Sequence, residues 1–70
     1  MEIVMEVFAL LGEWDCEGSA LLGVYASEEE ARNAHGVYTR DRERFIDRYY
    51  IVRQVLGAYV HDIDYDRMYL

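Results

Sequence analysis

The chain has 70 residues, one cysteine and a formal net charge of −7, which restricts it to a single small acidic domain, residues 1–70. A domain of this size buries only about 60% of the surface that its unfolded chain exposes, so a partner subunit is a common source of added stability. Phosphate backbones and anionic membrane surfaces repel an acidic protein, so we expect no direct nucleic-acid or membrane partner. The single cysteine, the lack of an export signal and the lack of a long apolar run predict a cytoplasmic protein.

Two strands joined by a turn are predicted in the first part of the chain. Residues 3–11 are rich in β-branched and large apolar side chains on both alternating faces, which favours a covered strand. Residues 13–18 have turn chemistry, and residues 19–26 read as a second strand, giving a hairpin with a loop of about four to six residues. Gly12 and Gly23 mark a bulge or a close backbone approach.

A helix is predicted to begin after Ser27 and to run from Glu28 to between Tyr38 and Arg42. Ser27 and Glu30 have the spacing of a capping box, in which the serine oxygen accepts from the third helical amide and the glutamate reaches back to the cap amide. The acidic first turn suits the positive end of the helix dipole.

A third strand is predicted over residues 47–56, with Tyr50 and Val52 on one face and Tyr49 and Ile51 on the other. Residues 58–60 are a candidate for a short fourth strand within an aromatic and acidic tail, residues 57–70. The order β-β-α-β, with or without the fourth strand, predicts an α+β two-layer sandwich: an antiparallel sheet of three to four strands with one helix on one face. We expect the third strand to lie beside the first.

The segments 7–10 and 22–31, together with Glu17-Gly18 and the later run 49–52, resemble a family of small bacterial and phage proteins of unknown function, DUF7336. In that family an apolar strand precedes a Leu/Ile-Gly-Val-Tyr-Ser-Ser strand and an Ala-rich helix, and a further strand closes the domain. The resemblance covers about residues 6–56, although this chain lacks the Pro-Asp-Gly turn that members carry before the last strand. The resemblance implies this fold and a bacterial or phage origin, and it brings no activity.

Residue types that serve catalysis or metal binding are few, and we predict no enzyme, no cofactor and no metal site. Cys16 lies between Asp15 and Glu17, whose negative charges disfavour a reactive thiolate. The alternating carboxylates of segment 61–66 resemble the start of a calcium loop, but Arg67 stands where the turn glycine is required and no glutamate closes the loop. We interpret this segment as a charged solvent face or as a protected strand edge.

Ten aromatic residues are many for 70, and those outside the expected core are candidates for protein contacts. They are Trp14 in the expected turn and Tyr59, Tyr65 and Tyr69 in the tail. The alternative is that the tail aromatics fold back onto the open face of the sheet. The chain is therefore expected to be a non-enzymatic protein–protein interaction module, a homodimer formed through a sheet edge or through the aromatic tail.

The acidic residues suggest an alternative function. Residues 1–31 hold eight acidic residues and no basic one. Glu13, Asp15 and Glu17 line the expected turn, and three glutamates, residues 28–30, open the helix. Such a surface resembles a phosphate backbone, so the alternative is a phage or mobile-element inhibitor that binds a basic site on a host nucleic-acid-processing protein.

Overall fold

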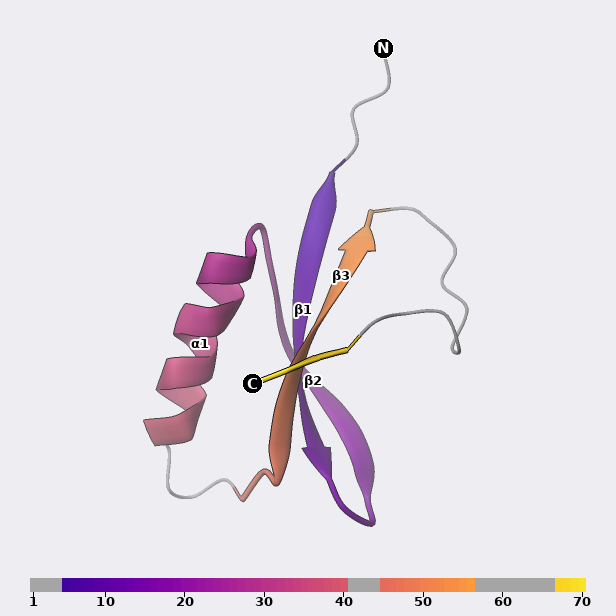
Figure 1. Cartoon of the computed structure of the whole chain (residues 1–70), viewed down its shortest axis with the longest axis vertical. Coiled ribbons are helices and arrows are strands. Elements are labelled where there is room, and N and C mark those ends of the chain that lie inside the picture. Colours follow the sequence, from indigo (N-terminus) through magenta and orange to yellow (C-terminus); the bar gives the residue numbers. More distant parts are fainter. Residues whose placement is uncertain (1–4, 41–44, 57–66) are drawn as a thin grey trace.

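The computed structural model describes residues 5–40, 45–56 and 67–70, which form one antiparallel sheet and one helix (Figure 1). The elements in chain order are β1 (Glu6–Trp14), β2 (Gly18–Tyr25), α1 (Glu28–Arg40), β3 (Arg48–Val55) and β4 (Met68–Tyr69). The four strands have the order β2-β1-β3-β4. The predicted α+β class is confirmed, and the third strand lies beside the first, as expected.

The hairpin between β1 and β2 is tighter than predicted. Trp14, expected in the turn, is the last residue of β1 and pairs with Gly18 across a three-residue loop. β1 continues past the predicted end at Leu11 because both neighbouring strands pair with it there: Glu13 lies opposite Ser19 on one side and opposite Arg48 on the other. Gly18 closes the loop with φ = 85°, a left-handed conformation that favours glycine.

A β-bulge interrupts β2 beside Gly23, which confirms the prediction for this glycine, whereas the atoms that come close to Gly12 belong to side chains and not to backbone. Leu10 pairs with Gly23 while Leu11 pairs with Leu21, so Leu22 is an extra residue in β2. On β1, a Cβ atom at Gly12 would lie 2.9 Å from Cγ2 of Ile46. The absence of a side chain at Gly12 therefore leaves room for the Ile46 side chain.

The helix α1 begins where the capping box predicted. The amide of Glu30 donates to Oγ of Ser27 over 3.1 Å, and the carboxylate of Glu30 accepts from the amide of Ala26 over 3.0 Å. The Glu30 carboxylate thus binds the amide one residue before the expected cap amide. The Glu30 amide in the first turn of the helix and the Ala26 amide before the helix both have an acceptor as a result. The helix is described to Arg40, and residues 41–44 lie outside the described residues.

The core lies between α1 and one face of the sheet (Figure 1). Cross-strand partners point to the same face, so Leu10 and its partner Ile51 face the helix, where Ala31 completes the buried centre. The next pair, Leu11 and Tyr50, faces away from the helix. The predicted alternation of β3 is therefore confirmed, and the sheet has a second, largely apolar face, called here the open face.

The tail contains a fourth strand. The described fourth strand is β4, at Met68–Tyr69, which pairs with Ile51 and Tyr50 of β3. The candidate over residues 58–60 lies outside the described residues.

Candidate interaction surface

Glu13, one of the predicted turn acids, is a bridging residue on the open face near the end of β1. Its side chain is only 18% exposed. Oε1 accepts from Nε and Nη2 of Arg48 on β3 over 3.1 and 3.0 Å. Oε2 lies 3.5 Å from Nη1 of Arg67 and accepts from the hydroxyl of Tyr69 over 3.3 Å. One carboxylate therefore joins three strands, with one oxygen serving β3 and the other serving the β4 segment.

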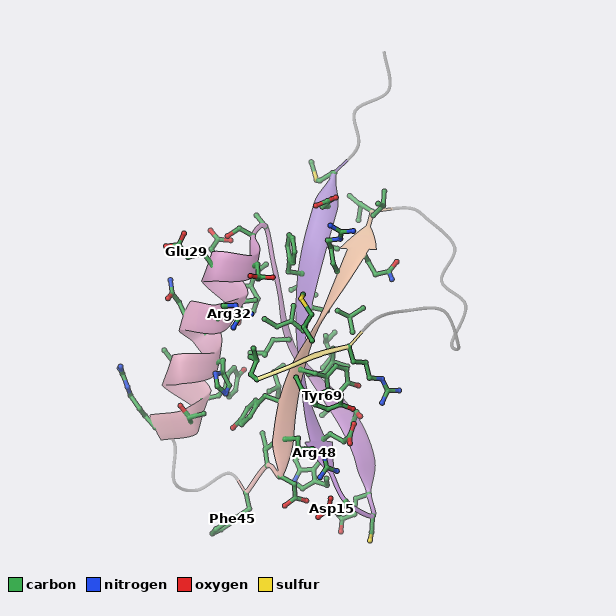
Figure 2. All side chains as sticks on the ribbon, in the orientation of Figure 1. Asp15, Glu29, Arg32, Phe45, Arg48 and Tyr69 are labelled. Atoms are coloured by element: carbon green, nitrogen blue, oxygen red, sulfur yellow. The ribbon has the colours of Figure 1, made fainter. Side chains whose placement is uncertain are left out.

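Asp15 adds a second acidic partner for the same arginine. Its Oδ1 lies 2.6 Å from Nη1 of Arg48, and Figure 2 shows the two side chains together at the hairpin end of the sheet. The hydrogen bonds that Arg48 donates to Asp15 and then to Glu13 raise the pKa of its guanidinium above its usual value. The backbone amide of Asp15 donates to Oδ2 of Asp47 over 2.8 Å. Two of the three predicted turn acids thus hold the sheet together, while Glu17 lies exposed in the turn.

The aromatic candidates have different environments. Trp14 is half-buried, and its indole Nε1 donates to the carbonyl of Phe45. Tyr69 packs against Tyr50 with ring centroids 5.3 Å apart, while the guanidinium of Arg67 lies 5.1 Å from the centre of the Tyr50 ring. Tyr69 therefore agrees with the alternative prediction, in which aromatic residues of the tail fold back onto the open face of the sheet. Tyr59 and Tyr65 lie outside the described residues.

The edge of β2 is the feature that sequence reasoning missed. Within the described part of the chain β2 pairs with β1 alone, so its other side is a strand edge without a partner strand. At the bulge, the carbonyl of Leu22 accepts from the hydroxyl of Tyr38 on α1 over 2.9 Å. The strand contains neither a charged residue nor a proline, the usual protections of an edge. Leu21 and Val24, both on the open face, are 62% and 55% exposed. The eight uncharged residues of β2 are unusual in so acidic a chain and could have drawn attention to this strand. Only the strand order shows that β2 lies at an edge of the sheet.

Among the other exposed apolar side chains, Phe45 and Val37 lie outside the strands. Phe45, before β3, is 85% exposed and points away from the sheet at its lower end in Figure 2. Val37 on α1 is 65% exposed. Neither belongs to a strand, so these two provide reference positions for the β2 edge.

The potential catalytic residues are placed separately. Cys16 is exposed in the hairpin turn, whereas His35 packs edge-on against Tyr49, with ring centroids 4.6 Å apart, between the helix and the sheet. Burial, and then the charge of Arg32, lower the pKa of His35. Among the described residues no group of three or more His, Cys, Asp or Glu side chains is placed to hold a metal ion, and the 61–66 segment lies outside them. In the same ranges, no helix has the length and apolar character needed to cross a bilayer.

Comparisons with protein-family models, with curated proteins and with solved structures found no match to this chain. The resemblance to the DUF7336 family therefore stays a prediction.

Proposed function

We propose that this chain is a non-enzymatic protein–protein interaction module that binds by strand addition at the edge of β2. The observation that carries the proposal is the uncharged free edge of β2 with Leu21 and Val24 exposed beside it. In strand addition, main-chain hydrogen bonds supply affinity, and alternate side chains along the strand supply specificity. An edge of this kind left uncovered is also a site of aggregation, which favours a dedicated partner.

The partner that fits this edge is a second copy of the chain. Each copy carries a net charge of −7, so two copies repel one another over most of their surfaces, and an uncharged edge is where that repulsion is least. The bulge at Leu22 leaves Gly18–Leu21 as the regular part of the edge. A two-fold axis at Ala20 then places Ser19 of one copy opposite Leu21 of the other, on the open face of a continuous sheet of both copies.

Light scattering after size-exclusion chromatography tests this proposal at micromolar protein. We expect the wild type to be a dimer and Leu21→Lys to be a monomer of 8.3 kDa, because the lysine places a charge on the edge. Val37→Lys is the matched control, since it replaces an apolar side chain of nearly equal exposure on the helix, and it should remain a dimer. A monomeric wild type, or equal dissociation of both variants, would contradict the proposal.

The inhibitor function stays a prediction with less support. Glu13 and Asp15 are already paired with arginines, and in the helix Glu30 caps Ala26 while Glu28 lies 3.2 Å from Arg32. These contacts reduce the negative charge available to a basic partner. The two acidic clusters also lie at opposite ends of β2 and not along one stripe.

A further inference from the structure

The edge of β3 is the second strand edge of this sheet, and β4 covers part of it. β3 pairs with β1 in unbroken register from Arg48 to Val55, so it has no bulge that would disturb a further partner. Its four central residues, 49–52, are all buried and apolar or aromatic. β4 covers this centre with only two residues.

The attachment of β4 is short, with two paired residues. Met68 packs against the core, whereas Tyr69 and Leu70 are exposed. Among the described strands β4 pairs with β3 alone. The amide of Leu70 donates to the carbonyl of Tyr49 over 3.0 Å, and Tyr69 packs against Tyr50. The polar contacts to Glu13 are long, at 3.3 and 3.5 Å, and involve the half-exposed Tyr69 and Arg67. Contacts of this kind hold a segment only weakly, since solvent competes for each of them.

With β4 displaced, the edge of β3 suits a second copy of the same strand. In an antiparallel β3–β3 pair with its axis at Ile51, Tyr50 of one copy faces Val52 of the other. In the same register Tyr49 faces Arg53, and Arg48 faces Gln54. No like charges are opposed, and the Tyr–Arg pairs are favourable, so the strand is complementary to itself.

We infer that β4 is a removable cover that blocks this second edge, and that its release lets β3 pair with β3 of a second copy. The consequence for assembly rests on the proposed function. A chain with free edges at both β2 and β3 forms an open-ended row of copies, whereas a chain with β4 in place stops at a dimer. Glu13 fastens the cover, because one of its oxygens is committed to Arg67 and Tyr69.

The test uses the Leu21→Lys variant, in which pairing at the β2 edge is prevented, so that any dimer must form elsewhere. Leu70→Pro deletes the amide that bonds to Tyr49, while Leu70→Ala keeps it and is the matched control. By light scattering we expect a dimer for Leu21→Lys/Leu70→Pro and a monomer for Leu21→Lys/Leu70→Ala. A monomer in both would overturn the inference. Failure of the proposed function is a separate result, namely a monomeric protein with Leu21 and Leu70 intact.

The role of Glu13 has its own measurement. In the Leu21→Lys background, Glu13→Gln should speed hydrogen exchange of the Leu70 amide about two- to fivefold, the effect of losing a weak ionic contact. Glu28→Gln removes a carboxylate that contacts Arg32 on the helix, so it should leave Leu70 exchange unchanged. Equal exchange rates in the two variants would show that Glu13 does not fasten the cover.

Discussion

Replacement of Gly12 by alanine tests the packing that joins the sheet to the segment before β3. Gly12 is buried in β1, and an added Cβ would lie 2.9 Å from Cγ2 and 3.0 Å from Cδ1 of Ile46, and 3.4 Å from Cδ1 of Leu22. The Cγ2 methyl is attached directly to the branched Cβ of Ile46, so it moves only if χ1 or the backbone moves. Overpacking of this kind costs about 1–3 kcal/mol.

The net effect is smaller, because alanine also restricts the unfolded chain and so stabilises the fold by about 0.4–1 kcal/mol. We therefore expect Gly12→Ala to lower the free energy of unfolding by about 0.5–2 kcal/mol. A chain of 70 residues has a total of roughly 4–10 kcal/mol, so this is a substantial loss.

Urea unfolding of Gly12→Ala should show a lower midpoint with an unchanged slope. The experiment is best done in the Leu21→Lys background, so that subunit dissociation does not contribute to the measured stability. Gly36→Ala is the matched control: the same change in α1 meets no atom within 4 Å and should raise stability by up to about 1 kcal/mol. If Gly12→Ala proved neutral or stabilising, the packing of Ile46 over β1 would be wrong.

The remaining predictions concern the helix. Ser27→Ala should destabilise the fold by about 1 kcal/mol in urea unfolding because the Glu30 amide loses its cap, and an unchanged midpoint would show that the cap contributes nothing. His35 has a folded pKa below its unfolded value of 6.5, so the unfolded state binds its proton first and stability should fall as pH drops through about 6.5. His35→Asn should lose this part of the pH dependence between pH 7.5 and 5.5, and an identical pH profile would refute it.

The parts of the fold that depend on local sequence were predictable. The Ser27–Glu30 spacing determines where α1 begins, since both of its hydrogen bonds lie within four residues. The alternation of β3 and the order of strands follow from the apolar pattern and the short connections. The predicted end of β1 was wrong because Glu13 and Trp14 precede residues that favour a turn. Their extended conformation depends on pairing with β2 and β3, which the local sequence does not show.

The surface was harder to predict because its contacts join distant residues. Glu13 reads as a free turn acid in the sequence, yet its partners Arg48 and Tyr69 are 35 and 56 residues away. The acidic surface of the inhibitor hypothesis was inferred without the ion pairs that Glu13 and Asp15 form with Arg48. Likewise, the composition of β2 indicates a strand, but its exposure depends on which strand occupies the edge of the sheet.

Isotope-filtered nuclear magnetic resonance on an equimolar mixture of labelled and unlabelled wild-type protein tests the central claim most directly. It detects only proton contacts between two different copies. Pairing at the edge of β2 predicts intermolecular cross-peaks between Ser19 and Leu21, on the regular part of the strand. A dimer whose only intermolecular cross-peaks came from Val37 or Phe45, or a mixture with none at all, would contradict the account.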